Sequence, residues 1–263
     1  MNSTIALLTD FGIDDPYVGI MKGIISHLSP GTSMIDITHQ IPAGDIQRGA
    51  FVLWQAAQDF PKGTIFLCVV DPGVGTERKG VFLQTRDHTF VGPDNGLFSY
   101  LLYKSDFSCW ELRNPDLQGQ NRSSTFHGRD IFAPAAANAA KYVSGDQFGP
   151  QVDQLKELPR PDQKVSENSL EGQILSRDHF GNLFTSLGKF KHRDNPLHYE
   201  SWIDGTELQI HNKTPIQIHV NDLQLQLVRT FGSVDQGHSP VLSAAPAYWK
   251  SLPIVLPPIL LRE

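Results

Sequence analysis

Residues 64–78 read TIFLCVVDPGVGTER, an apolar run that ends in a carboxylate, two glycines and an arginine. The run Thr64–Val70 lacks polar alternation, which is typical of a strand covered on both faces in the parallel sheet of an α/β domain. Ligands of such domains bind beyond the carboxyl ends of the strands, and the proline and glycines allow a tight turn there. Asp71 and Arg78 are therefore expected to converge on one site. The alternative is that Asp71 only caps the turn and Arg78 is a solvated surface charge.

The chain has 263 residues, of which 40% are hydrophobic and 19% charged, the composition of a globular protein with one large or two modest domains. Its formal net charge is −6 and it contains no run of lysine and arginine, which disfavours nucleic acid and membrane partners and favours a small molecule. The N-terminus lacks a basic segment before a long apolar run, and no stretch approaches a membrane span. These features predict a cytoplasmic protein.

The two cysteines cannot build a disulfide framework or a zinc cluster. Cys68 lies inside the apolar run and is expected to be a small core residue, whereas Cys109 is expected in a loop. The ten histidines show no HExxH or similar ligand spacing. We therefore expect neither a bound metal ion nor a cofactor.

A second predicted strand, Ile5–Thr9, also ends in a carboxylate, Asp10, within the sequence TDFG. A carboxylate in this place often accepts ribose hydroxyls in nucleotide-binding α/β folds, although the GxGxxG that usually precedes it is missing here. Asp10 is thus a second candidate for the site. Its alternative role is to cap the following turn.

Hydrophobic periodicity and turn residues predict the other elements of the first domain. Helices are expected over Tyr17–Leu28, Ile46–Phe60 after a cap at Asp45, Leu97–Tyr103 and Ile131–Val143, and strands over Met34–Ile37, Gly80–Leu83 and Thr89–Val91. The last two strands are close enough in sequence to form a hairpin. Residues 106–124 are polar and are expected to form a loop of the kind that covers active sites.

Two more polar residues occupy predicted turns. His127, in TFHGRD, stands just ahead of a helix, whose positive end disfavours imidazolium and keeps the ring neutral and available as a base near pH 7. An isolated histidine is more often structural, but its place between loops marked by glycine and proline favours a function. Asn95, in GPDNG, either faces the same site or only turns the chain.

Residues 145–166 contain three prolines and few apolar residues, which predicts a linker. We place this linker at 151–168, between an α/β domain at 1–150 and a second domain at 169–263. Short alternating runs separated by turns predict that the second domain is a small all-β barrel. These runs are Leu170–Leu175, Leu183–Leu187, Glu207–His211, Ile216–Val220 and Leu223–Val228.

The motifs LLTDFG, VDPGVGTER, GPDNG, TFHGRDIFAP and DHFGN, in this order, resemble those of the S-adenosyl-L-methionine hydroxide adenosyltransferases, relatives of nucleoside fluorinating and chlorinating enzymes. The resemblance implies an α/β domain with a largely parallel sheet, a C-terminal β-barrel, and a homotrimer with active sites between subunits. It also implies a reaction in which S-adenosyl-L-methionine and water give adenosine and L-methionine.

The resemblance assigns Asp71, Arg78 and His127 to one catalytic set, which should lie within hydrogen-bonding reach. A neutral His127, oriented by Asp71, would take a proton from water while Arg78 holds the developing hydroxide. The leaving thioether is neutral, so it needs no general acid. The residues implied in substrate binding are Asp10 for the ribose hydroxyls, Asp178 for the methionine ammonium, Phe180, Asn182 and Phe231 for the nucleoside pocket, and Asn95 as a further contact.

Two other functions stay open. One is a halide adenosyltransferase that makes 5′-halo-5′-deoxyadenosine, and the other is a non-catalytic protein that binds S-adenosylmethionine or adenosine. The halide-using relatives lack the Asp–Arg–His set, because a halide needs desolvation rather than a base. Its presence here favours water as the nucleophile.

The tail, residues 237–263, departs from the family, which would show a strand resembling SxGxLEIA there. Its five prolines remove donors that such a strand needs. A shifted reading frame is our hypothesis, because Tyr248-Trp249-Lys250 must be encoded TAY-TGG-AAR, and reading from the third base of the tyrosine codon gives Leu and then Glu. We therefore expect the tail to pack poorly and the adenine pocket to lack one wall.

Overall fold

The computed structural model describes residues 3–103, 105–119, 123–165, 170–177, 183–191, 197–210, 218–220, 223–228, 241–243 and 255–256. The chain divides into two compact units, residues 1–158 and residues 159–263. Each unit is described by itself. Among the described stretches, no helix is both long enough and apolar enough to cross a membrane.

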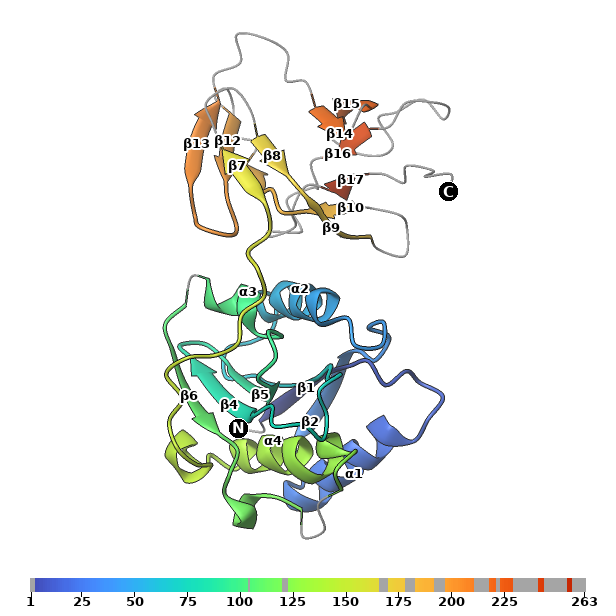
Figure 1. Ribbon diagram of the computed structural model, residues 1–263, viewed down its shortest axis with the longest axis vertical. Helices are drawn as coiled ribbons and strands as arrows, with labels where there is room; N and C mark the ends of the chain where they lie inside the picture. Colours follow the sequence, from blue (N-terminus) through green and yellow to red (C-terminus); the bar gives the residue numbers. More distant parts are fainter. Residues whose placement is uncertain are drawn as a thin grey trace. The chain divides into compact units, whose positions relative to one another are not determined.

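Unit 1 is built around a six-stranded sheet in the order β2-β1-β3-β5-β4-β6 (Figure 1). Strands β1 (Thr4–Thr9), β2 (Ser33–Thr38), β3 (Ile65–Val69) and β5 (Thr89–Pro93) pair in parallel. Strand β4 (Gly80–Thr85) is antiparallel to both of its neighbours, β5 and β6 (Phe107–Glu111), so β6 runs in the same direction as the first four strands. The predicted α/β domain is confirmed, with a mixed and mostly parallel sheet. The hairpin of β4 and β5 is confirmed as well.

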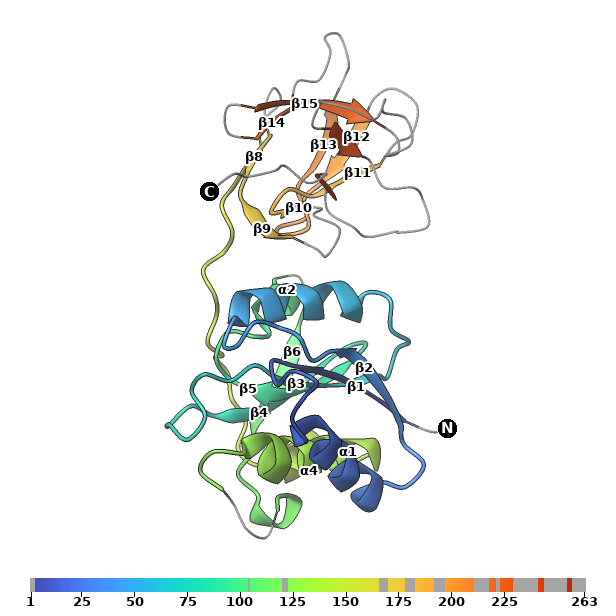
Figure 2. The same cartoon turned by 90° about the vertical axis from the view of Figure 1, so that its right-hand side faces the viewer.

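Helices cover both faces of this sheet (Figure 2). On one face lie α1 (Tyr17–Leu28) and α4 (Ala133–Ala140), and on the other lie α2 (Ile46–Ala57) and α3 (Ser99–Leu102). Successive strand residues point to opposite faces, so Ile5 packs with α1 whereas Ala6 packs with α2. All five residues of β3 are buried, which explains the unbroken apolar run.

The predicted helices differ from the observed ones mainly at their ends. Helix α1 has the predicted bounds, and Asp45 caps α2 by accepting a hydrogen bond from the Arg48 amide at 2.9 Å. Helix α2 ends at Ala57 rather than Phe60, and α3 is shorter than expected. The last predicted helix begins as a π-helical turn, η2 (Gly128–Phe132), and continues as α4.

The prediction of a polar loop over residues 106–124 is wrong for its first part. Its first part is strand β6, which pairs with β4 from Val81 to Thr85, and Cys109 is fully buried in that strand. Only Cys109 is buried in β6, so the strand lacks the continuous apolar run that would have revealed it. A 3₁₀ turn, η1 (Pro115–Leu117), follows.

Residues 151–158, inside the predicted linker, pack on unit 1 after the 3₁₀ turn η3 (Gly145–Gln147). The Val152 amide donates a hydrogen bond to the Cys109 carbonyl at 2.8 Å. The Lys156 amide donates to Asp94 Oδ1 at 2.7 Å. The proline-rich stretch therefore belongs in part to the α/β unit.

The described residues of unit 2 form short strands and no helix. They are β7 (Gln163–Val165), β8 (Leu170–Gly172), β9 (Ile174–Arg177), β10 (Leu183–Thr185), β11 (Lys189–Lys191), β12 (Leu197–Glu200), β13 (Glu207–Ile210), β14 (Ile218–Val220), β15 (Leu223–Val228), β16 (Val241–Ser243) and β17 (Val255–Leu256). Small antiparallel pairs dominate, and β15 and β16 are the one parallel pair among the described strands of this unit. Apart from β16 and β17, the tail at 237–263 lies outside the described residues, so its poor packing stays a prediction.

Candidate active site

Two carboxylates follow neighbouring parallel strands of unit 1. Thr9 at the end of β1 pairs with Val69 at the end of β3, and the Asp10 amide donates to the Val69 carbonyl at 3.3 Å. Burial raises the pKa of Asp10 above its ordinary value, and the negative charge of Asp71 raises it further. The amide of Gly44 opposes this rise by donating to Asp10 Oδ2 at 2.8 Å. The two strand ends thus bring Asp10 and Asp71 within electrostatic reach of each other.

The loop after β3 turns back on itself and delivers Arg78 to Asp71. Thr76 Oγ1 donates to the Gly73 carbonyl at 2.7 Å and closes the turn. Gly75 has φ +79°, and a Cβ atom there would lie only 2.6 Å from the Ser124 carbonyl oxygen. Only glycine fits at this position, both in conformation and in space.

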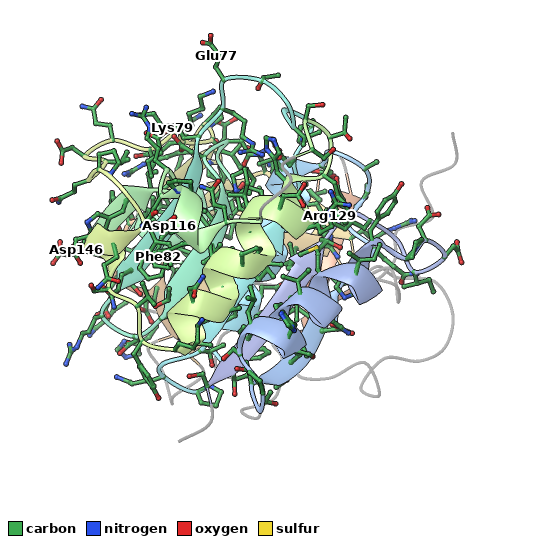
Figure 3. The ribbon with its side chains drawn as sticks, turned by 90° about the horizontal axis from the view of Figure 1, so that it is seen from below. Glu77, Lys79, Phe82, Asp116, Arg129 and Asp146 are labelled. Carbon is green, nitrogen blue, oxygen red and sulfur yellow. The ribbon has the colours of Figure 1, made fainter. Side chains whose placement is uncertain are left out.

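Arg78 and Asp71 form a buried, bidentate ion pair. Arg78 Nε donates to Asp71 Oδ1 at 2.8 Å, and Arg78 Nη2 donates to Oδ2. The two side chains expose only 5% and 4% of their surfaces. Glu77, the neighbouring residue, instead points away from the protein at the outer end of the loop (Figure 3). The structure thus brings together the two residues that the sequence places at one site.

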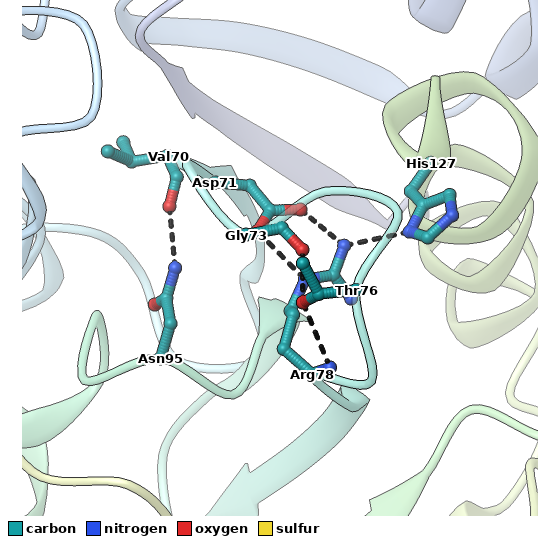
Figure 4. A network of polar contacts seen from close by, with 7 residues as sticks. All are labelled: Val70, Asp71, Gly73, Thr76, Arg78, Asn95 and His127. Atoms are coloured by element: carbon teal, nitrogen blue, oxygen red, sulfur yellow. Dashed lines mark hydrogen bonds and ion pairs between the residues drawn. The ribbon is translucent and has the colours of Figure 1, made fainter. Parts of the chain in front are cut away.

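His127 joins this pair through the arginine (Figure 4). Arg78 Nη2 lies 2.9 Å from His127 Nδ1. A guanidinium can only donate, so Nδ1 accepts, and a neutral His127 carries its proton on Nε2. The structure therefore brings Asp71, Arg78 and His127 into one network in which the guanidinium connects the carboxylate to the imidazole.

The backbone around His127 is a π-helical turn. His127 precedes η2 directly, and the Ala133 amide donates to the Gly128 carbonyl five residues earlier. The Phe132 ring at the end of this turn lies under the Arg78 guanidinium, with Cζ 5.0 Å from the ring centroid. Sequence reasoning missed Phe132, because no usual spacing rule relates it to His127.

Asn95 is tied to the backbone of the same region. Its Nδ2 donates to the Val70 carbonyl at 2.8 Å, and its Oδ1 accepts from the Leu97 amide at 3.2 Å. Val70 immediately precedes Asp71, so Asn95 holds the end of β3 while it turns the chain. A contact of Asn95 with a substrate stays a prediction.

The remaining sequence-predicted residues cannot be placed in this site. Asp178, Phe180, Asn182 and Phe231 lie outside the described residues. Sequence reasoning also missed Gly44, which bonds Asp10; its positive φ of 72° in the turn before α2 is the reason for a glycine there. Across the described part of the chain, no three His, Cys, Asp or Glu side chains gather as a metal site.

Comparison with known families and proteins gives consistent matches. The family described as SAM hydroxide adenosyltransferase N-terminal domain matches residues 5–149. The chain is 42% identical over 183 residues to (R)-S-adenosyl-L-methionine hydrolase of Salinispora tropica, covering 68% of this chain and 70% of that one. It is 39% identical over 188 residues to the protein of the same name from Thermus thermophilus, covering 68% of this chain and 72% of that one. A fluorinase of an Actinoplanes species is 24% identical over 269 residues, covering 92% and 87%.

Two solved structures resemble nearly the whole chain. An uncharacterized conserved protein from Thermotoga maritima has a TM-score of 0.76 and 29% identity, covering 96% of this chain and 91% of that one. A conserved hypothetical protein from Thermus thermophilus has a TM-score of 0.69 and 31% identity, covering 97% and 90%. These matches extend over both units.

Proposed function

The chain belongs to the S-adenosyl-L-methionine hydroxide adenosyltransferase family, and from this premise we propose that it hydrolyses S-adenosyl-L-methionine to adenosine and L-methionine. It is an enzyme, a SAM hydrolase. Because relatives near 40% identity are named for the R form, we extend the proposal to (R)-S-adenosyl-L-methionine as the substrate. The structural observation that supports this function is the Asp71–Arg78–His127 network.

The reaction is a displacement at the ribose 5′ carbon. The oxygen of water forms a bond to this carbon while the carbon–sulfur bond breaks, and the bonding electrons leave with methionine as a neutral thioether. One proton must leave the attacking water. The protein therefore has to assist the nucleophile and not the leaving group.

Arg78 is suited to hold this nucleophile. Its Nε and Nη2 are engaged by Asp71 and His127, whereas its Nη1 has no hydrogen-bond partner among the residues that the structure describes. The two N–H groups of Nη1 can donate to the attacking oxygen and stabilise the charge that develops there. Asp71 fixes the plane of the guanidinium by its two hydrogen bonds.

The acceptor for the proton is His127 Nδ1, whose lone pair Arg78 engages at 2.9 Å. We propose that the attacking water replaces this contact, donating a hydrogen bond to Nδ1 while it accepts one from the guanidinium. Contacts of this kind often reach their working geometry only when the substrate is bound. The nearby carboxylate of Asp71 offsets the positive charge that the imidazole then acquires.

Asp10 is proposed to bind the ribose hydroxyls. Its Oδ2 accepts from the Gly44 amide, and the two carboxylate oxygens have lone pairs for further hydrogen bonds. It follows the strand next to the one that carries Asp71, so a ribose held there would present its 5′ carbon near the network. The Asp10 carboxylate would then accept hydrogen bonds from both hydroxyls of the diol.

The second unit is proposed to complete the site from a neighbouring subunit. In this proposal unit 2 closes into a β-barrel, the protein is a homotrimer, and Asp178, Phe180, Asn182 and Phe231 contact the methionine ammonium and the nucleoside. Light scattering measures the assembly. A monomer that still hydrolyses S-adenosylmethionine would refute the shared site.

Turnover in water labelled with oxygen-18 tests the reaction itself. Incubation with each sulfonium epimer should give adenosine and methionine in equal amounts, with the label in the adenosine 5′ hydroxyl. Chloride should yield no 5′-chloro-5′-deoxyadenosine. A chlorinated product would support the halide transferase instead, and tight binding without any product would support a non-catalytic binding protein.

Substitution of the proposed base tests the role of the network. His127→Ala should lower kcat by about 100-fold or more with little change in KM, because the base acts on water and not on bound substrate. Glu77→Ala, at an exposed position of the same loop, is the matched control and should leave kcat unchanged. An unchanged kcat in His127→Ala would exclude the base role.

A further inference from the structure

The face of the Arg78 guanidinium is covered by an aromatic ring that belongs to no predicted set of site residues. Arg78 Cζ lies 5.0 Å from the centroid of Phe132, and Phe132 is fully buried. The hydrogen bonds to Asp71 and His127 lie at the edge of the guanidinium, so the ring adds support on its face. Guanidinium groups are weakly hydrated and stack well on aromatic rings.

The position of the Phe132 ring is fixed by its surroundings. A Cβ atom on Gly80, at the start of β4, would lie 3.0 Å from Phe132 Cε1, so a side chain at Gly80 would press on the ring. Gly80 follows Arg78 by two residues on the same segment. The ring therefore fills the space directly beneath the backbone that carries the arginine.

The π-helical turn explains how His127 and Phe132 reach the same guanidinium. In an α-helix with 3.6 residues per turn, side chains five positions apart point about 140° away from each other. In a π-helical turn the hydrogen bond spans five residues and brings such side chains to one side. The bond from the Ala133 amide to the Gly128 carbonyl has this spacing. Single π-helical turns are often found at functional sites.

We infer that Phe132 is a positioning residue for the reaction, and that the π-helical turn sets it and His127 around Arg78 so that the Nη1 donors face the attacking oxygen. This inference rests on the proposed function for its kinetic consequence. Phe132 itself touches no reacting atom. Its loss should therefore let the guanidinium plane tilt without removing any catalytic group.

The kinetic test is Phe132→Leu, with Phe90→Leu as the matched control. Phe90 is equally buried but packs in the cluster on the other face of the sheet. Both substitutions remove the same atoms from a core, so both should lower thermal stability. Phe132→Leu should lower kcat by about tenfold to thirtyfold, the range of a desolvated cation–π contact, with KM little changed. Equal effects of the two substitutions on kcat would overturn the inference.

A double-substitution cycle separates positioning from general packing. In an Arg78→Lys background the planar group is gone, so Phe132→Leu should lower kcat much less than it does in the wild-type background. A purely structural role predicts the same fold loss in both backgrounds. That result would contradict the role assigned to Phe132.

A spectroscopic test does not depend on turnover. The Arg78 Nε–H signal in nitrogen-15 NMR should shift and exchange faster with water in Phe132→Leu, but not in Phe90→Leu. An unchanged signal would overturn the inference even if the enzyme is active. If the wild-type protein makes no adenosine while the signal responds as expected, the proposed function fails and the positioning of Arg78 by Phe132 stands.

Discussion

Gly75 lies so close to Ser124 that a Cβ atom on the glycine would come within 2.6 Å of the serine carbonyl oxygen. This contact joins two segments that are far apart in the sequence. Gly75 belongs to the loop that carries Asp71 and Arg78, and Ser124 precedes His127 by three residues. The same two segments are joined by the contact of Arg78 Nη2 with His127 Nδ1 at 2.9 Å.

Gly75→Ala should lower both stability and kcat, because the added methyl group pushes the loop away from the segment that carries His127. Gly63→Ala is the control, since Gly63 also has a positive φ, +85°, but a Cβ there would meet no atom within 4 Å. The control should cost about 1–2 kcal/mol of unfolding free energy from backbone strain alone, with kcat retained. Urea unfolding and turnover measure both effects. Wild-type kcat in Gly75→Ala would show that the loop contact does not set the site.

The Arg78–Asp71 pair should be costly to break from one side. Arg78→Met leaves the Asp71 carboxylate buried without its partner, which should lower the free energy of unfolding by about 3–5 kcal/mol. Lys164→Met is the control, because Lys164 pairs with Glu171 at 3.1 Å but exposes 82% of its side chain. The control should change stability by about 1 kcal/mol or less. If Arg78→Met has the same urea midpoint of unfolding as the wild-type protein, the Arg78–Asp71 pair does not stabilise the fold.

Much of unit 1 could be predicted because its signals are local. The apolar run of β3 and the helical spacing of α1 reflect burial that each segment imposes on its own sequence. The convergence of Asp71 and Arg78 followed from a strand end and a turn of glycines, which are also local features. For this reason the two residues could be placed in one network before their contact was known.

Other features depend on contacts between distant segments. Strand β6 buries only Cys109, so its place in the sheet comes from its pairing with β4 and leaves little trace in its own sequence. The stacking of Phe132 on Arg78 requires the π-helical turn, which residue spacing does not reveal. The sequence suggested that Asp71 orients His127, whereas the structure shows that Arg78 bonds to both residues.

Both cysteines should be unreactive in the folded protein. Burial raises the pKa of the Cys109 thiol to about 12, and burial raises the pKa of Cys68 as well. The thiolate is the form of cysteine that attacks a disulfide reagent, and it is scarce at neutral pH when the pKa is high. A thiol-specific disulfide dye should therefore label neither cysteine in native protein and both in urea. Rapid labelling of native protein would contradict the burial of the two cysteines in the sheet.

Asp10→Asn should make the folded protein more stable at pH 7 while it weakens substrate binding. Burial, opposed in part by the Gly44 amide, raises the pKa of Asp10 above its ordinary value of 3.8. At pH values between the pKa of Asp10 in the unfolded protein and its higher pKa in the folded protein, the native state keeps a proton that the unfolded state has lost. The free energy of unfolding therefore falls as pH rises through this window. Asparagine removes the free-energy cost of a buried carboxylate at pH 7, and its side-chain oxygen can still accept the hydrogen bond from the Gly44 amide. KM should rise, because an amide replaces the carboxylate that we propose binds the ribose hydroxyls.

The pH dependence distinguishes this explanation from a general effect of the substitution. The extra stability of Asp10→Asn should shrink as pH falls through the raised folded pKa of Asp10, because the carboxyl of the wild-type protein takes up its proton there. Asp36→Asn should behave in the opposite way. Burial alone would raise the pKa of Asp36, but hydrogen bonds from Lys22 and His39 hold it below the ordinary value. Asp36 therefore stabilises the fold above the unfolded pKa, and this stability is lost as pH falls through the lower folded pKa. The urea midpoints of the wild-type protein, Asp10→Asn and Asp36→Asn, determined at a series of pH values from neutral to acidic, measure both trends. A gain in Asp10→Asn that is independent of pH would contradict a raised pKa at Asp10.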